Sequence, residues 1–236
     1  SRTNRLLSKH ASLIAQSFKN VKFTPEKIKT ILTGMPIRKA ILDIRNKPYP
    51  KLGPKDKFQI LVLGGSQGAK VFSDVVPSVI KSFDKKTQKQ IKIIQQCREA
   101  DIKDVKKAYK GAEAEVVLSH FFNNMPELYS TSHLIISRAG ASSVSEILAV
   151  GIPSILVPLP TAADNHQTYN AQDVVEAKGG MILAQKDFND KNLSQLLKDL
   201  MKDPKKLSTM AANAKKAGIT DAAVRFADAI EKDILK

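Results

Sequence analysis

Cysteine and tryptophan are almost absent from this sequence, which has one cysteine, Cys97, and no tryptophan in 236 residues. A single thiol cannot form an intrachain disulfide, so a disulfide-stapled scaffold is excluded and a reducing compartment is expected. No run of eighteen or more apolar residues occurs, and the first twenty residues lack the apolar core of a signal peptide. The hydrophobic fraction of 42% and the charged fraction of 26% are typical of a globular chain with a core.

Acidic residues are scarce in the first quarter of the chain. The whole sequence has 38 Lys and Arg against 23 Asp and Glu, a net charge of +15. Residues 1–60 contain 14 of the basic and 3 of the acidic residues, a net charge of +11. This excess suggests contact with phosphates on nucleic acid, on lipid headgroups or on a small ligand. A solvated lysine-rich surface is the alternative.

Several well-known motifs are also missing. The sequence contains no G-x-G-x-x-G, no Gly-Lys-Ser/Thr phosphate loop, no H-E-x-x-H and no C-x-x-C. Its histidines are scattered, so no metal-ligand cluster is predicted.

The first 60 residues are irregular. Apolar residues at 7, 11, 14 and 18 predict an amphipathic helix over residues 3–18, and a short strand is expected at 29–32. Residues 43–57, with three prolines and a glycine, have the composition of a linker. Because the predicted helix has an apolar stripe without a partner, we expect a further segment upstream.

From residue 59 onward, short apolar strands alternate with helices. Strands are expected at 59–63, 91–96, 115–118, 133–136, 154–157 and 180–183. Helices are expected at 69–83, 101–109, 124–129, 142–150, 165–178, 190–201, 204–217 and 221–235. Such alternation predicts one α/β domain with a doubly wound parallel sheet covered on both faces.

Three loops at predicted carboxyl ends of strands contain residues suited to ligands. The first, residues 63–69 (LGGSQGA), contains three glycines that let the backbone approach a phosphate before a helix N-terminus; tight packing is the alternative. In the second, residues 137–146 (SRAGASSVSE), the helix start suits an anion and Glu146 suits sugar hydroxyls. The S-x-x-E spacing from Ser143 to Glu146 is also that of a capping box.

The third loop, residues 160–170 (PTAADNHQTYN), is dense in hydrogen-bonding side chains, as a sugar site requires. Asp164 could instead be a plain helix N-cap, and His166 a surface histidine.

The three loops occur together, in this order, after the segment Gly34-Met35-Pro36-Ile37-Arg38. This combination resembles the bacterial MurG family of glycosyltransferases, which add N-acetylglucosamine to the undecaprenyl-linked muramyl-peptide precursor of peptidoglycan. The resemblance covers practically the whole chain. Met35 stands where the family usually has Asn, and residues 95–98 (QQCR) replace the family's more usual His-Gln-Ser/Thr-Gly.

The resemblance implies a GT-B fold, with two Rossmann-like domains and the active site between them. It implies that residues 1–37 are the end of the N-terminal acceptor domain and that 38–57 form the linker. Residues 58–217 would then be the C-terminal UDP-sugar-binding domain. Residues 218–236 would form a helix that packs on the N-terminal domain. The family's G-G-x-G-G-H loop is not in this chain, and the general base is expected upstream.

The resemblance also implies a role for each matching residue. Arg38 would contact the donor diphosphate, and Glu146 the ribose hydroxyls. The backbone of Phe122 would contact the uracil edge, and His166 and Gln167 the N-acetylglucosamine hydroxyls. Residues expected to face the phosphates are Gly65, Ser66, Gln67, Ala141, Ser142, Ser143, Val144 and Ser145.

The implied reaction is an inverting transfer that needs no metal or cofactor beyond its substrate, UDP-N-acetylglucosamine, since no D-x-D motif occurs. The other implied partners are the lipid-linked muramyl-pentapeptide acceptor and an anionic membrane surface. The expected location is peripheral, at the cytoplasmic face of the bacterial inner membrane. Nucleic acid is not expected, because aromatic residues are few and no nucleic-acid module occurs.

Three alternatives remain open at this point. One is a related GT-B enzyme such as a diacylglycerol glycosyltransferase. Another is a UDP-N-acetylglucosamine epimerase. The third is a non-catalytic UDP-sugar-binding half that works with a separate subunit.

Overall fold

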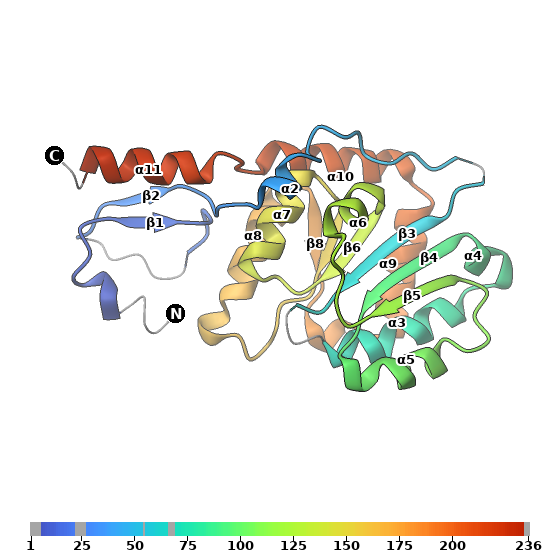
Figure 1. Ribbon diagram of the computed structural model, residues 1–236. Helices are drawn as coiled ribbons and strands as arrows, with labels where there is room; N and C mark the ends of the chain where they lie inside the picture. The colour runs from blue at the N-terminus through green and yellow to red at the C-terminus, as the bar shows by residue number, and fades with distance from the viewer. Residues whose placement is uncertain (1–5, 22–26, 54, 66–68, 234–236) are drawn as a thin grey trace.

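The computed structural model describes residues 6–21, 27–53, 55–65 and 69–233. Within these ranges the strands form a two-stranded and a six-stranded sheet, and helices cover both faces of the larger one (Figure 1). The strand order of the larger sheet is β5-β4-β3-β6-β7-β8, and every neighbouring pair is parallel. The predicted doubly wound α/β fold is confirmed.

The six strands lie close to their predicted positions. They are β3 (Phe58–Leu63), β4 (Ile91–Gln96), β5 (Glu115–Ser119), β6 (Leu134–Ser137), β7 (Ser154–Leu156) and β8 (Gly180–Ile182). The chain builds outward from β3 in one direction to β5, returns to β6 beside β3, and continues outward to β8. We call the edge where the strands end the carboxyl edge, and the edge where they begin the amino edge. The reversal between β3 and β6 is the topological switch point, where such folds bind ligands.

The central strand β3 shows why the sheet needs two helical layers. All six of its residues are buried. Ile60 and Val62 belong to one apolar cluster, and Leu61 and Leu63 belong to the other. Successive side chains of a strand point to opposite faces, so a continuous apolar run requires cover on both.

Helices supply that cover. The first cluster is closed mainly by α3 (Lys70–Ser82), α5 (Ile102–Ala108) and α9 (Asp190–Met201). The second is closed mainly by α2 (Lys39–Leu42), α6 (Met125–Thr131), α7 (Ala141–Val150) and α8 (His166–Glu176). The long α10 (Pro204–Ala217) contributes to both clusters. The short elements are α4 (Lys85–Lys89) and the 3₁₀ helices η1 (Glu99–Asp101), η2 (Ala163–Asn165) and η3 (Gln185–Asp187).

The segment expected to be a linker is packed against the six-stranded sheet. Ile41 and Ile44 are buried in the second cluster. The Arg45 guanidinium donates to the carbonyl oxygens of Ala149, near the end of α7, and Lys215, near the end of α10. Carbonyls in the last turn of a helix have no partner within it, so a basic side chain there stabilises the helix. The proline-rich composition of this segment gave no indication of these contacts.

The predicted helix over residues 3–18 is wrong in its second half. Ile14–Gln16 forms strand β1, which pairs in parallel with β2 (Thr30–Leu32) near its expected position. Apolar positions at 11, 14 and 18 fit a helix. However, the run around Ile14 is short enough to fit a strand as well, and pairing with β2 decides between them. Residues 1–5 lie outside the described ranges.

The small sheet contacts the rest of the chain along α8. The backbone N–H groups of Lys19 and Asn20 donate to the carboxylate of Asp173, over 3.0 and 3.3 Å. Phe18 is buried in the second cluster. The last helix, α11 (Ala222–Asp233), lies at the same end of the molecule as β1 and β2 (Figure 1) and leaves Phe226 exposed. The assignment of residues 1–37 and 218–236 to an N-terminal domain stays a prediction.

Candidate functional site

Two of the predicted loops meet at the switch point on the carboxyl edge. Leu63 lies beside Ser137 in the sheet, and the Arg138 N–H donates to the Leu63 carbonyl over 3.3 Å. The first loop then turns at Gly65, whose φ is +79° and where a Cβ atom would meet nothing within 4 Å. A left-handed backbone beside open space allows a ligand to approach the main chain. Ser66 and Gln67 lie outside the described residues.

Helix α7, which starts within the second predicted loop, has an uncapped N-terminus. Gly140 is its N-cap, no side chain caps it, and its first turn has no acidic residue. The capping box from Ser143 to Glu146 does not form, because Ser143 already lies inside the helix. The uncapped N–H groups and the helix dipole favour an anion here. Val144 is fully buried in the second cluster, and its N–H donates to the Gly140 carbonyl over 2.9 Å, so neither its side chain nor its N–H is open to a ligand.

Glu146 has partners on both carboxylate oxygens. Arg38 donates to Oε1 from Nε (3.0 Å) and from Nη2 (2.9 Å), and the Tyr129 hydroxyl donates to Oε2 (3.0 Å). The Glu146 side chain is 11% exposed, whereas that of Arg38 is 64% exposed. Burial, and secondarily the Glu146 carboxylate, raise the pKa of Tyr129, so its hydroxyl stays protonated and donates. The two predicted ligand residues therefore meet, 108 positions apart in the sequence.

The segment before α2 also lies against α7. The Ser142 hydroxyl is 3.9 Å from the Met35 sulfur atom. Ser145 lines a narrow crevice together with Gly34 and Met35. The structure thus brings the predicted segment 34–38 to the start of α7, with Ser142 exposed and Ala141 and Ser143 partly exposed beside it.

Gln167 joins the second and third loops. Its side-chain oxygen accepts from the N–H groups of Ala139 (3.2 Å) and Leu159 (3.0 Å), which orients the carboxamide and leaves its NH₂ group as a donor. One turn later, the side-chain nitrogen of Asn170 donates to the Ala139 carbonyl over 3.0 Å. The start of α8 is therefore fixed against the start of α7.

The third loop has a strained backbone just before α8. Asp164 and Asn165 are consecutive non-glycine residues in the left-handed region, with φ of 55° and 57°. Asn165, and not Asp164, is the N-cap. Left-handed non-glycine residues are costly and cluster at ligand sites. His166 is exposed, and its Nδ1 lies 2.7 Å from the Ala163 carbonyl oxygen, so Nδ1 donates.

Phe122 lies on the loop after β5, with its ring partly buried against the second cluster. Its N–H and C=O take part in no backbone hydrogen bond among the described residues. They therefore remain available for a flat polar edge such as that of a base.

Two residues at this edge were not assigned a role from the sequence. Tyr129 lies in α6, in no motif, and a buried tyrosine leaves no signal in the sequence. Arg138 lies in a motif but serves the fold. It donates to Val157 O (3.1 Å) and to the Gln185 side chain (2.6 Å), and packs over Phe72. Burial lowers the pKa of Arg138.

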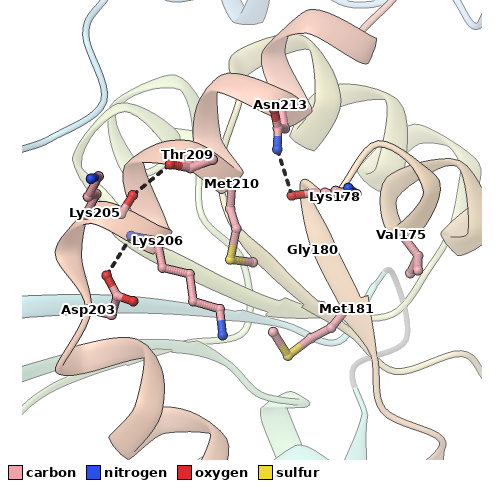
Figure 2. A pocket seen from close by; sticks show the side chains of 10 residues that line it. All are labelled: Val175, Lys178, Gly180, Met181, Asp203, Lys205, Lys206, Thr209, Met210 and Asn213. Carbon is pink, nitrogen blue, oxygen red and sulfur yellow. Dashed lines mark hydrogen bonds between the residues drawn. The ribbon is translucent and has the colours of Figure 1, made fainter.

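A cavity of about 540 Å³ lies at the opposite, amino edge (Figure 2). It is lined by the end of α8, the start of β8 and the first half of α10. Lys178, Lys205 and Lys206 lie around it, with Met181 and Met210. None of the predicted site residues lines it. Among the described residues, no group of three or more His, Cys, Asp or Glu could hold a metal ion. No described helix is long and apolar enough to cross a bilayer.

Residues 59–226 match the glycosyltransferase family 28 C-terminal domain. The chain belongs to this family. The match covers the six-stranded sheet, its helices and the start of α11. The resemblance stated from the sequence motifs is therefore confirmed.

Two curated relatives of this family 28 chain have the name UDP-N-acetylglucosamine–N-acetylmuramyl-(pentapeptide) pyrophosphoryl-undecaprenol N-acetylglucosamine transferase. The relative from Granulibacter bethesdensis is 39% identical over 233 residues, covering 99% of this chain and 61% of its own. That from Rhodospirillum rubrum is 39% identical over 229 residues, covering 97% and 59%. The chain thus spans about three fifths of the length of these relatives.

Solved structures give the same result for the fold. Acinetobacter baumannii MurG matches with a TM-score of 0.77 and 29% identity, over 98% of this chain and 63% of that one. A UDP-N-acetylglucosamine 2-epimerase matches with a TM-score of 0.62 and 15% identity. The epimerase likeness shows the fold alone.

Proposed function

We propose that this chain holds the donor site of an N-acetylglucosaminyltransferase. The enzyme would transfer N-acetylglucosamine from UDP-N-acetylglucosamine to an undecaprenyl-diphosphate-linked muramyl-pentapeptide. The names of the relatives at 39% identity support the reaction. The observation on which the donor site rests is the meeting of Arg38, Glu146 and the uncapped α7 N-terminus at the switch point.

The nucleotide half of the donor would lie across this point. The diphosphate takes the N–H groups at the start of α7, the open backbone at Gly65 and the Arg38 guanidinium. Glu146 accepts from the ribose hydroxyls, and the backbone of Phe122 pairs with the uracil edge. Ser142, Ser143 and Ser145 contribute from α7, and Ser66 and Gln67 from the glycine loop.

The sugar half would lie over the third loop. The oriented NH₂ group of Gln167 and the exposed His166, whose Nδ1 is bound to the Ala163 carbonyl, suit the hydroxyls of N-acetylglucosamine. A sugar site needs several polar groups that converge on the ligand. The hydrogen bonds of Gln167 hold its carboxamide in a fixed orientation before the ligand binds.

The chemical step would be one inverting displacement. The acceptor hydroxyl attacks the anomeric carbon, and the bond from that carbon to the UDP oxygen breaks. The developing charge on the leaving phosphate is stabilised by Arg38, by backbone N–H groups and by the α7 dipole. The general base that removes the acceptor proton would come from the part of the relatives that this chain does not span.

The acceptor is lipid-linked, so the enzyme would work at a membrane surface. The net charge of +11 in residues 1–60 suits the anionic cytoplasmic face of the inner membrane. The expected association is peripheral.

Calorimetric titration of the 236-residue chain with UDP-N-acetylglucosamine tests the donor site, with UDP-glucose and ATP as controls. Selective binding of the first, even at a Kd near millimolar, is expected. Equal weak binding of all three would indicate a generic phosphate site and favour another GT-B enzyme. No binding to a chain that circular dichroism shows to be folded would contradict the donor site in this chain.

A further inference from the structure

We propose that Tyr129 is the positioning residue of Glu146, which the proposed function assigns to the ribose hydroxyls. Arg38 occupies Oε1 of the same carboxylate until the ribose displaces it. The inference rests on the proposed function, because it presumes that a UDP-sugar binds at the start of α7. It adds a role for Tyr129 and an exchange of partners by Arg38.

Tyr129 holds Glu146 from the buried side. The tyrosine is 2% exposed, and its hydroxyl donates to Oε2 over 3.0 Å. A buried hydrogen bond to a charged group is stronger than an exposed neutral one, because water does not compete for it. The bond fixes the rotation of the carboxylate, and with it the direction of the remaining acceptor positions.

Arg38 occupies one of those positions. Nε and Nη2 both donate to Oε1, at 3.0 and 2.9 Å, so the guanidinium is not paired with the two oxygens side by side. The Arg38 side chain is 64% exposed. An ion pair with such an exposed partner is weak. A ligand can therefore displace the arginine without unfolding anything around it.

Counting acceptor positions shows how much of this exchange the ribose requires. Each carboxylate oxygen accepts about two hydrogen bonds. Arg38 fills both positions on Oε1, and Tyr129 fills one on Oε2. One position remains, so two ribose hydroxyls bind Glu146 together only if Arg38 releases at least one of its two hydrogen bonds. The released guanidinium lies beside the uncapped start of α7, where the diphosphate would lie.

The first test compares uridine with UDP on the full chain and on Arg38→Ala, by NMR titration. Uridine has the ribose but no phosphate. The variant should bind uridine about threefold more tightly, because a competing partner of Glu146 is gone. It should bind UDP at least about tenfold more weakly, because a charge-assisted contact to phosphate is lost.

Loss of affinity for uridine in the variant, or no change, would overturn the exchange while leaving the donor site in place. Failure of the folded unsubstituted chain to bind either compound would instead contradict the proposed function. The two failures are thereby distinguishable.

The second test uses Tyr129→Phe with UDP and with 2′,3′-dideoxyuridine diphosphate. The variant should bind UDP about tenfold more weakly, and the dideoxy compound less than about twofold more weakly. Equal losses for both compounds would mean that Tyr129 supports the fold alone, and would overturn its positioning role.

Tyr109→Phe is the matched control for this test. Tyr109 is also buried, and its hydroxyl donates to the Gln95 side chain over 2.7 Å, on the other face of the sheet. The control should bind both compounds as the unsubstituted chain does. A tenfold loss of UDP affinity there would overturn the inference, because the effect would not depend on Glu146.

Discussion

The two edges of the six-stranded sheet contain similar residue types in opposite arrangements. At the carboxyl edge, α7 begins without a cap, Asp164 and Asn165 have left-handed backbones, and Glu146 is paired with an exposed arginine. At the amino edge, His133 is stacked on Phe58 and accepts a hydrogen bond from the Gln59 N–H over 3.0 Å. The polar groups at the carboxyl edge are open to a ligand, whereas those at the amino edge are buried in the protein. Among the described residues there, His133 Nε2 and the Ser154 hydroxyl are buried without a hydrogen-bond partner.

Glycines and ion pairs follow the same division. Gly65 at the carboxyl edge faces open space, whereas Gly151 at the amino edge packs against α10. Glu115, at the start of β5, is paired with Lys57 and Lys92, which lower its pKa. Substitutions at the carboxyl edge should therefore change binding, and substitutions at the amino edge should change stability.

The largest effect is expected from Gly151→Ala. Its φ is +82°, and a Cβ atom would lie 2.5 Å from Lys215 Cβ and 2.8 Å from Ala211 O. The left-handed backbone and the clash together should lower the free energy of unfolding by about 3 kcal/mol. Gly65→Ala has nearly the same φ without the clash, and should lose about 1 kcal/mol. Urea denaturation measures both, and equal losses would show that packing at Gly151 is unimportant.

The next largest effect is expected on donor affinity, from a comparison of the Glu146 and Glu115 carboxylates. Glu146→Gln should weaken UDP-N-acetylglucosamine binding by about 2 kcal/mol, because hydrogen bonds to a charged acceptor are lost. Glu115→Gln removes an ion-paired carboxylate at the amino edge and should leave donor affinity unchanged. Calorimetry on both variants makes the comparison. A similar loss in Glu115→Gln would mean that net charge, and not the carboxyl edge, controls binding.

A smaller effect is expected on the pH dependence of folding stability, through the protonation of His133. Burial lowers the pKa of His133 from its usual 6.5, so below pH 6.5 the unfolded chain takes up a proton that the folded chain does not. Stability should fall as pH decreases from 6.5 toward the folded-state pKa, by at most about 1.4 kcal/mol per pH unit. His133→Asn should show a shallower decrease in thermal unfolding between pH 7 and 5. An unchanged slope would contradict the assignment.

The smallest effect is expected at the amino-edge cavity. Lys206→Gln removes a charge from its lining. Donor affinity should change by less than about twofold, because exposed charges far from a ligand are screened by salt. A tenfold loss in calorimetric titration would place the donor in this cavity and reverse the assignment of the two edges.

Much of the architecture could be predicted from local pattern. Strands from β3 to β8 and helices from α7 to α10 lie within a few residues of their expected positions, because apolar periodicity reports directly on burial. Short elements were missed or misassigned. β1 lies where a helix was expected, and α2 lies within the expected linker, because four or fewer residues give no measurable period.

The candidate site divides in the same way. Glycines after β3, a helix start after β6 and polar residues before α8 follow from strand–helix alternation, so the sequence alone brings them to one edge. It could not show that the Glu146 carboxylate faces Arg38 and Tyr129 and not the helix N-terminus. The capping box needs neighbours three residues apart, whereas the observed partners are 108 and 17 residues away.

The sequence by itself thus determined which loops lie at the carboxyl edge and which residue types they offer. Tertiary structure alone decided which polar groups remain open there, which side chains are already paired, and that Ile41, Ile44 and Arg45 pack against the six-stranded sheet and its helices. The physical reason is the separation along the chain over which each kind of interaction acts. Periodicity and turn chemistry act over a few residues, whereas the partner of a half-buried charge is chosen by the packing of distant elements.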